Sequence, residues 1–306
     1  MIIKKIEGLI AAPFTPFDEN GDLNLEQIPA YYQSLKSNQV KGGFICGSTG
    51  EGVSLTFQEK VAVVQAWSTL TKTDPDFKLI VLLGGTNIRE CIELAKISEE
   101  EGVDAISFTS PFYFKPANVG QLAACCVEIA AAAPNTAFYY YHIPVLTGGN
   151  YPMIDLLKAV DGVIPNFAGI KYTHEDFMDF LSCMNFAGRK YDMLWGRDEN
   201  MLSSLILGAK GAVGSTYNYA APLYHDLISA FNAGDFERAN ALQQKSIDMI
   251  TLLGKYGGIS VGKTYMKLIG LDCGEFRLPI KNMSQEQFVA FQSDVAELEF
   301  ASFSSK

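Results

Sequence analysis

Short apolar segments alternate with amphipathic ones along most of the chain. The apolar segments are rich in branched and aromatic residues with few polar interruptions, which is typical of strands covered on both faces. Such strands are predicted near residues 8–14, 43–46, 79–83, 105–108, 137–141, 168–172, 193–195 and 212–215. The segments between them have helical patterns, so the repeating unit is strand, loop, helix.

Helix-capping signals mark where several of the intervening helices begin and end. Thr56 and Glu59 have the spacing of a capping box, and Asn87 with Glu90 opens a second helix that Gly102 can end. Two further helical segments stop at a helix-breaking residue, 119–133 before Pro134 and 199–207 before Gly208. The alternation therefore continues without a linker to about residue 215.

Repeated strand-helix units of this number predict an α/β fold, the (β/α)8 TIM barrel. The competing doubly wound sheet usually carries Gly-x-Gly-x-x-Gly after its first strand, and this sequence has no such motif there. Amphipathic patterns at 224–232, 236–253 and 262–269 predict additional C-terminal helices. We expect residues 1–220 to form the barrel, residues 221–306 to pack on it within the same structural unit, and the tail at 302–306 to fray.

The composition excludes several classes of protein. Of the 306 residues, 48% are hydrophobic and 19% are charged, so the chain can bury a large core. The 34 acidic residues outnumber the 24 basic ones, and the net charge of −10 would repel nucleic-acid phosphates and anionic lipid. The longest weakly polar stretch, 122–133, is too short to cross a bilayer, and no signal-peptide cleavage pattern follows Lys4 and Lys5. We expect a cytoplasmic protein with no nucleic-acid or membrane partner.

Cysteine and histidine usage argues against a disulfide scaffold and against a metal site. The six cysteines include no Cys-x-x-Cys pair, and in a chain of this length we expect them to be reduced thiols that fill core space. The three histidines form no His-Glu-x-x-His motif and have no carboxylate at a recognisable ligand spacing. We therefore expect no bound metal.

In a barrel, the residues that follow each strand converge on one face and carry the chemistry. Lys171 ends the apolar run 168–170 of the sixth predicted strand, where burial would remove water from the ammonium and lower its pKa. A neutral amine is a nucleophile that can form a Schiff base with a carbonyl substrate. For a lone lysine in a strand, however, a carboxylate partner or an ammonium that reaches the rim is the commoner explanation.

The Gly-Ser-Thr-Gly-Glu turn at 47–51 is a candidate anion site. Two glycines flank Ser48 and Thr49, so backbone N–H groups and hydroxyls can converge on one ligand. A carboxylate fits better than a polyphosphate, because the turn has no lysine and Glu51 would repel a phosphate unless it points away. An ordinary tight turn between a strand and a helix explains the motif equally well.

Two other strand ends offer polar groups that also have plain structural explanations. Tyr141 ends the fifth strand, and its phenol can relay a proton, although aromatic residues in strands more often fill the core. Asp198 and Glu199 follow the seventh strand and suit sugar hydroxyls, but adjacent acids at such a place commonly complement a helix dipole. None of these motifs decides the function alone.

Taken together, the ordered motifs resemble the dihydrodipicolinate synthase/N-acetylneuraminate lyase family of class I aldolases. They extend over nearly the whole chain and lie at residues 8–17, 47–51, 141–144, 169–173 and 211–218. The resemblance implies Lys171 as the Schiff-base lysine, Tyr141 as the proton-handling phenol, and Ser48 and Thr49 as ligands of a pyruvate carboxylate. It also implies a homotetramer built from dimers, with Tyr113 near a subunit contact as part of a hydroxyl relay.

The second substrate distinguishes the members of this family. Dihydrodipicolinate synthases place an arginine between the strand-five proline and the Thr-Gly pair, where it binds a second carboxylate, but this chain has Leu146. A lost bidentate arginine contact costs on the order of a few kcal/mol. The stretches 196–199 and 214–219 instead resemble the sialic-acid lyase pattern, apart from Arg197, which replaces an aromatic or aliphatic residue. The residues expected to bind the sugar are Thr173, Gly196, Asp198, Glu199 and Ser215.

The resemblance thus implies an enzyme that reversibly cleaves N-acetylneuraminate, a sialic acid, to N-acetylmannosamine and pyruvate. No cofactor is expected, because an iminium on Lys171 is itself the electron sink. Three alternatives stay open: another pyruvate-dependent aldolase acting on a 2-keto-3-deoxy sugar acid, a dihydrodipicolinate synthase, and a non-enzymatic barrel that binds a sugar acid.

Overall fold

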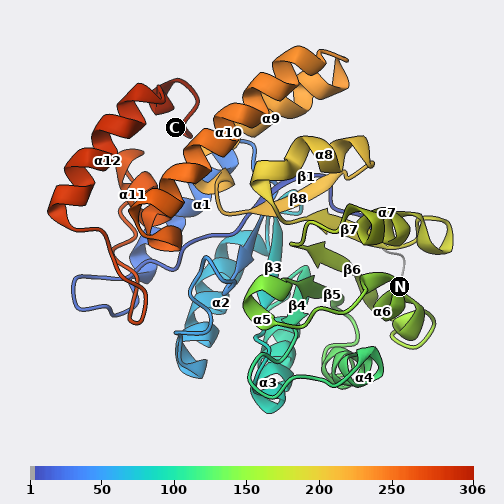
Figure 1. Ribbon diagram of the computed structural model, residues 1–306. Coiled ribbons are helices and arrows are strands. Elements are labelled where there is room, and N and C mark those ends of the chain that lie inside the picture. Colours follow the sequence, from blue (N-terminus) through green and yellow to red (C-terminus); the bar gives the residue numbers. More distant parts are fainter. Residues whose placement is uncertain (1–3) are drawn as a thin grey trace.

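The computed structural model describes residues 4–306, which form a closed barrel of eight parallel strands (Figure 1). Each strand pairs with the next one along the chain, and β1 pairs with β8 to close the ring. The strands are β1 Gly8–Ala11, β2 Gly42–Ile45, β3 Lys78–Leu82, β4 Ala105–Thr109, β5 Ala137–His142, β6 Phe167–Tyr172, β7 Asp192–Trp195 and β8 Gly211–Gly214. The predicted α/β barrel is confirmed. Residues 1–3 of the predicted barrel segment lie outside the described residues.

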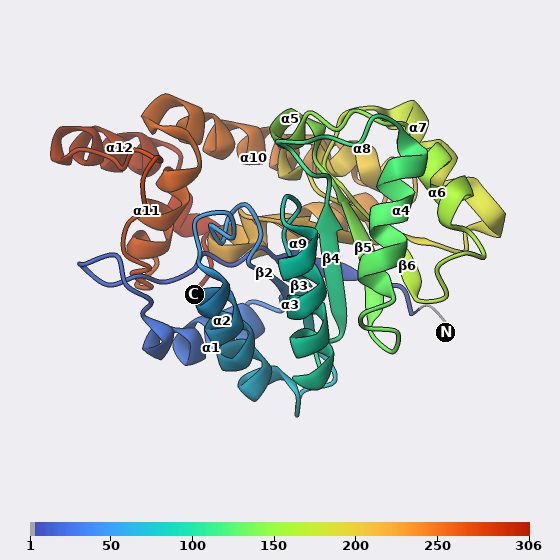
Figure 2. The ribbon, with the colours of Figure 1, turned by 90° about the horizontal axis from the view of Figure 1, so that it is seen from below.

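Helices cover the outside of the barrel between successive strands (Figures 1 and 2). They are α1 Ile28–Ser37, α2 Phe57–Thr71, α3 Ile88–Glu100, α4 Val119–Ala130, α6 Met153–Val160, α7 Phe177–Asn185 and α8 Met201–Ile206, while the short α5 Pro144–Thr147 follows β5 directly at the end of the barrel. The predicted caps are present, since Thr56 and Glu59 make a reciprocal capping box at α2 and the Asn87 side chain accepts from the Glu90 N–H at α3. Within residues 4–306, the helices lack the combination of length and apolar character needed to cross a membrane.

The predicted C-terminal helices are confirmed, with one addition. They are α9 Tyr217–Asn232, α10 Phe236–Tyr256, α11 Val261–Leu268 and α12 Gln285–Glu297. The prediction missed α12, although Ser284 and Gln287 form a capping box at its start. Helix α9 begins earlier than predicted because a short first turn joins it across a kink at Ala220, ahead of Pro222.

The last residues of the chain are held in place, so the predicted fraying of the tail is wrong. The Ser305 N–H donates to the Tyr219 carbonyl at 2.8 Å, and the Lys306 N–H donates to Asn38 Oδ1 at 3.0 Å. Phe303 is buried and packs edge-to-face on Phe300. These contacts tie the chain terminus to α9 and α1.

A bulge in β6 determines which way Lys171 faces. Phe138 pairs with Phe167, but the next residue, Tyr139, pairs with Gly169, so Ala168 is an extra residue in β6. Ala168 and Lys171 are three positions apart and would face opposite sides of a regular strand. With the bulge, Ala168 packs in the barrel interior and Lys171 Nζ lies over the ring of Tyr141, which is also interior.

Candidate active site

One pocket lies at the ends of the barrel strands and collects most of the predicted site residues. Its lining includes Ser48 and Thr49 after β2, Tyr141 and Lys171 in β5 and β6, Gly196, Asp198 and Glu199 after β7, and Ser215 after β8. Thr173 lies behind this lining, directly against Gly196. The structure therefore brings together groups from five strands, as expected for this fold.

Lys171 is a buried amine without a counter-ion. Its side chain is 4% exposed, and within residues 4–306 no carboxylate lies at ion-pair distance from it. Nζ lies 3.9 Å from the ring centre of Phe44 and 4.1 Å from that of Tyr141. Burial lowers the pKa of Lys171 to about 7, while the more distant Asp198 carboxylate acts weakly in the opposite direction. A large fraction of this amine is therefore a neutral nucleophile near neutral pH.

The turn at 47–51 presents unused hydrogen-bond donors. In the described part of the chain, the N–H groups of Ser48 and Thr49 donate to no other protein atom. The turn is closed by the Gly52 N–H, which donates to the Gly47 carbonyl at 3.0 Å. Gly52 must be glycine, because a Cβ there would lie 1.8 Å from the Cys46 carbonyl oxygen. Two free N–H groups and two hydroxyls that point to one place have the chemistry to bind a carboxylate.

Glu51 points away from the pocket and anchors the turn from beneath. Its carboxylate pairs with Lys263 Nζ of α11 at 2.9 Å, and both side chains are 3% exposed. The other Glu51 oxygen accepts from the Arg277 N–H at 2.9 Å. Burial raises the pKa of Glu51 and lowers the pKa of Lys263, and each charge opposes the effect on the other. Because the charge of Glu51 is paired with Lys263, Glu51 does not oppose the binding of an anion at the turn.

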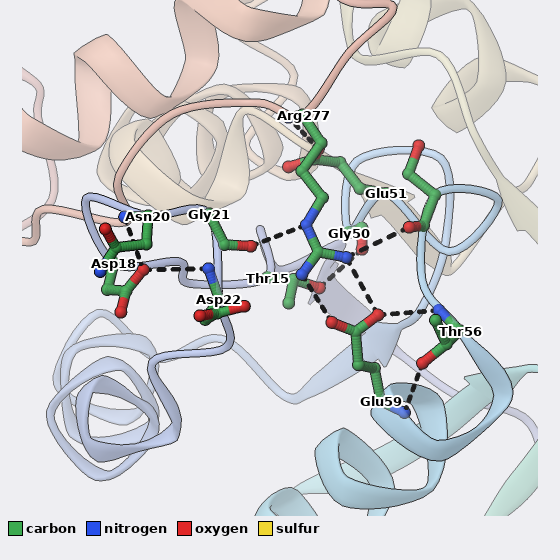
Figure 3. Close-up of polar contacts among 11 residues, drawn as sticks. Thr15, Asp18, Asn20, Gly21, Asp22, Gly50, Glu51, Thr56, Glu59 and Arg277 are labelled. Carbon is green, nitrogen blue, oxygen red and sulfur yellow. Dashed lines mark hydrogen bonds and ion pairs between the residues drawn. The ribbon is translucent and has the colours of Figure 1, made fainter.

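Arg277 extends this anchor to helix α2 (Figure 3). Its guanidinium binds both oxygens of Glu59, at 2.9 and 2.5 Å, and also donates to the Gly21 carbonyl at 2.8 Å. Because of this pairing, the pKa of Glu59 is lowered to about 2. Glu59 also belongs to the Thr56 capping box, so the C-terminal segment fixes the start of the helix that follows the anion-binding turn.

Tyr141 lies beside Lys171 and is fully enclosed. The two residues pair across β5 and β6, and the Tyr141 carbonyl accepts from the Thr109 hydroxyl at 2.9 Å. Burial raises the pKa of Tyr141 to about 12, and the nearby Ser48 and Thr173 hydroxyls act in the opposite direction. The phenol therefore keeps its proton at neutral pH and is suited to relaying a proton rather than to being a standing base.

Asp198 is a buried residue of the pocket wall, and one of its oxygens makes two hydrogen bonds. Oδ2 accepts from the Thr216 N–H at 3.0 Å and from its hydroxyl at 2.6 Å, and the nearby Tyr217 hydroxyl also acts to lower the pKa of the carboxyl group. The carboxylate can come so close to β8 because residue 214 is glycine, where a Cβ would lie 1.8 Å from Oδ1. Burial raises the pKa of Asp198 to about 6, so the group is mostly ionised above that pH.

The C-terminal helices hold Asp198 in this position. Gln243 of α10 donates to the Asp198 carbonyl at 3.2 Å and accepts from the Leu202 N–H at 2.8 Å. The Thr216 hydroxyl that binds Asp198 also lies 2.7 Å from the Tyr224 hydroxyl of α9. The Tyr224 hydroxyl in turn lies 2.8 Å from the Ser246 hydroxyl of α10. Figures 1 and 2 show α10 running past this end of the barrel. Of these supporting residues, the sequence pointed only to Thr216, which follows the eighth predicted strand.

Three other residues singled out in the sequence lie at the edge of the pocket or outside it. Leu146 of α5 lines the pocket and is 62% exposed. Tyr113 is 77% exposed and packs edge-to-face on Phe114, outside the pocket. Arg197 lies at the rim, where its side chain contacts Glu199 rather than solvent alone.

The pocket combines a buried amine of lowered pKa, a turn with unused N–H donors, a phenol and two carboxylates. In the part of the chain that the structure describes, no group of three His, Cys, Asp or Glu side chains could hold a metal ion. A neutral lysine beside a carboxylate site, at the open end of a (β/α)8 barrel, is the arrangement that a Schiff-base aldolase needs.

Comparison with known proteins identifies the family. The dihydrodipicolinate synthetase family profile matches residues 5–298, and the chain belongs to this family. It is 39% identical to N-acetylneuraminate lyase of Rattus norvegicus over 98% of this chain and 95% of the relative. Among solved structures, Proteus mirabilis N-acetylneuraminate lyase has a TM-score of 0.93 at 38% identity, over 97% of this chain and all of the other. The Aliivibrio salmonicida N-acetylneuraminate lyase (sialic acid aldolase) has a TM-score of 0.94 at 36% identity, over 97% and 98% of the two chains.

Proposed function

We propose that this protein is a Schiff-base lyase that reversibly cleaves N-acetylneuraminate to N-acetylmannosamine and pyruvate. The observation that carries the proposal is the buried Lys171 amine, with a pKa of about 7, in one pocket with the free N–H groups of turn 47–51. The substrate is supported by the relatives named N-acetylneuraminate lyase, which match this chain over nearly its whole length.

The reaction begins at the keto acid end of the open-chain substrate. Ser48 and Thr49 hold the carboxylate and so place the adjacent C2 ketone beside the Lys171 amine. Attack by the amine and loss of water give an iminium, which withdraws electrons from the C3–C4 bond. Bond cleavage leaves the enamine of pyruvate on Lys171. Protonation at C3 and hydrolysis then release pyruvate and restore the free amine, so the chemistry requires no cofactor.

Tyr141 moves the proton that bond cleavage releases. The C4 hydroxyl must lose its proton as it becomes the aldehyde of N-acetylmannosamine. A phenol with a pKa of about 12 does this best as a relay, receiving that proton while it passes its own to the substrate carboxylate or a water. Ser48 lies next to the phenol and belongs to the same chain of hydroxyls.

The opposite side of the pocket receives the hydroxyl chain of the sugar. Asp198 contributes a buried carboxylate to the pocket lining, where it would accept a hydrogen bond from a substrate hydroxyl. The Thr173 hydroxyl lies near the Tyr141 phenol and directly against Gly196, so it would act between the two sides of the pocket. Gly196, Glu199 and Ser215 complete this side with a carbonyl, a carboxylate and a hydroxyl.

Replacing Tyr141 with phenylalanine tests the relay. We expect adduct formation with pyruvate to persist and cleavage to slow by roughly a hundredfold or more, because only the proton-carrying hydroxyl is lost. Single-turnover release of pyruvate, measured beside borohydride trapping, separates the two steps. Tyr140→Phe is the matched control, since the neighbouring Tyr140 packs toward the helices outside the barrel. A Tyr141→Phe enzyme with unimpaired cleavage would remove this residue from the mechanism.

A panel of substrates tests the proposed activity against its alternatives. We expect pyruvate release from N-acetylneuraminate; release only from a shorter 2-keto-3-deoxy sugar acid would identify a different aldolase. Condensation of pyruvate with aspartate semialdehyde would identify a synthase, which Leu146 disfavours because its side chain cannot bind a second carboxylate. Ligand binding without turnover or a covalent adduct would leave a sugar-acid-binding protein.

We further propose a homotetramer built from dimers, with Tyr113 near a subunit contact. The support is the exposure of Tyr113 and Phe114, 77% and 84%, next to each other on the loop after β4. At such a contact the Tyr113 hydroxyl would complete the relay. Light scattering tests the assembly, since a tetramer has four times the 33.5 kDa mass of the chain and a monomer would contradict the proposal.

Residues 221–306 are proposed to form one structural unit with the barrel. The protein is also proposed to be cytoplasmic. The bond from Gln243 to the Asp198 turn and the Lys263–Glu51 ion pair support the first statement, because both reach residues of the pocket wall. All six cysteines are free, which supports a reducing compartment. A single cooperative unfolding transition is expected if the two parts form one unit. Cell fractionation is expected to recover the protein in the cytoplasmic fraction.

A further inference from the structure

Arg197 connects two loops at the rim of the pocket. One nitrogen of its guanidinium lies 2.7 Å from Glu199 Oε1 and 2.9 Å from Glu175 Oε1. Glu175 belongs to the loop after β6, the strand that carries Lys171, whereas Arg197 and Glu199 belong to the loop after β7. The guanidinium therefore joins the loop of the nucleophile to the loop of the expected sugar-binding acids.

The backbone beneath Arg197 is held by a hydrogen bond and by close packing. The Trp195 indole N–H donates to the Arg197 carbonyl at 2.6 Å, and Trp195 is fully buried with its ring stacked on Phe177. The adjacent Gly196 leaves no room for movement toward β6, since even a Cβ there would lie 1.9 Å from Thr173 Oγ1. Arg197 therefore presents its side chain from a fixed point, which limits the positions that its carboxylate partners adopt.

Arg197 is the charged group that contacts Glu199. In residues 4–306, the Glu199 carboxylate has Arg197 as its one ion-pair partner and accepts no hydrogen bond from another side chain. Glu175 shares the same guanidinium nitrogen, so two carboxylates lie close together at this rim, and the charge of Glu199 also raises the pKa of the buried Asp198. Without the cation, mutual repulsion would favour Glu199 conformations directed into solvent and away from the pocket.

Direct binding of the substrate carboxylate by Arg197 fits the structure less well. The guanidinium already contacts two carboxylates, so its charge is more than offset locally. Arg197 is also absent from the pocket lining, which includes Glu199. These observations favour a role exerted through Glu199.

We propose that Arg197 is a specificity-determining positioning residue, which holds Glu199 where it accepts hydrogen bonds from the far end of the substrate's hydroxyl chain. The inference rests on the proposed lyase function and adds to it the residue that makes the polyol end selective. It requires that Arg197 affect binding of the sugar product and leave binding of pyruvate, at the other side of the pocket, unchanged.

The condensing reaction separates these two ends, because pyruvate and N-acetylmannosamine have their own KM values. For Arg197→Met we expect the KM of N-acetylmannosamine to rise about tenfold, the effect of a weakened charge-assisted hydrogen bond. The KM of pyruvate and kcat should stay within about threefold of wild type. Arg197→Lys should recover part of the loss, because an ammonium can still pair with Glu199. Arg238→Met is the matched control, as Arg238 is an exposed arginine of α10 with a loose 3.8 Å pair to Asp226.

The outcomes are distinct. An unchanged KM for N-acetylmannosamine in Arg197→Met, or an equal rise in both KM values, would overturn the positioning role while the lyase function stands. A wild-type enzyme that neither forms nor cleaves N-acetylneuraminate would reject the proposed function and the inference with it. Thermal unfolding of each variant checks that the fold is retained, and Arg197→Lys supplies the comparison if the methionine variant is unstable.

Discussion

Replacing Lys171 with methionine is expected to abolish turnover, by at least about a thousandfold, and to remove the covalent adduct with pyruvate. The iminium cannot form without the amine, and no other lysine lines the described pocket. Borohydride reduction in the presence of pyruvate, followed by mass analysis of peptides, should label Lys171 in the wild type and nothing in the variant. Lys96→Met, which removes an exposed lysine of α3, is the control and should be labelled like the wild type.

The same variant should be at least as stable as the wild type. The folded-state pKa of Lys171 is depressed from 10.5 to about 7, so the unfolded chain binds more protons between these values. Stability therefore increases with pH in this window, and the full cost of burying the amine is present below about pH 7. Methionine has no such cost. A clearly lower melting temperature for Lys171→Met at pH 7 would contradict this account of the buried amine.

The depressed pKa also predicts the pH dependence of adduct formation. Only the neutral amine attacks the ketone, so the rate of trapping with pyruvate should rise as the pH increases through about 7 and then level off. For an ordinary lysine pKa the rise would continue beyond pH 9. The rate of trapping measured from pH 5 to 10 distinguishes these two profiles.

Replacing Lys263 with methionine is expected to lower the free energy of unfolding by about 3–5 kcal/mol, because Glu51 would be left as an unpaired buried charge. The loss should also raise the KM of pyruvate, since Glu51 anchors the turn that carries Ser48 and Thr49. Urea unfolding and condensation kinetics measure the two effects. Lys267→Met removes an exposed lysine of the same helix, paired with Asp272 at 3.3 Å, and should cost less than about 1 kcal/mol.

A double variant tests whether charge pairing is the cause. Glu51→Gln preserves an acceptor for the Arg277 N–H and removes the charge that Lys263 balances. We expect the pair Glu51→Gln and Lys263→Met together to be more stable than Lys263→Met alone, because no isolated charge is then buried. Additive losses would show that the two side chains contribute through packing instead.

Much of the fold was predictable because it follows from local patterns. Strands buried on both faces leave continuous apolar runs, and capping residues such as Thr56 and Asn87 satisfy helix ends within a few positions. Helix α12 was missed although Ser284 and Gln287 signal its start, since its apolar stripe is weak and only Phe291 and Val295 are buried. The tail was mispredicted because its partners, on α1 and α9, are distant in sequence.

The candidate site was predictable to a different extent. Lys171, Tyr141 and the turn at 47–51 were candidates from strand ends and family motifs, and the structure places them around one pocket. Their supports, such as Lys263, were not identifiable, because a lysine in an amphipathic helix normally points to solvent. Arg197 was noticed only as a departure from the family pattern, and its contacts with Glu175 and Glu199 depend on two loops meeting.

The amino-acid sequence alone determined the barrel, the order of its strands and the kinds of group at their ends, because these depend on short-range periodicity and motif spacing. The tertiary structure decided the inward direction of Lys171, through one extra residue in β6, and the burial that lowers its pKa. It also decided that Glu51 pairs with Lys263 and that Thr216 binds the Asp198 carboxylate. These properties arise from contacts between distant segments, whose electrostatic effects depend on burial and distance, and neither quantity is present in a linear pattern.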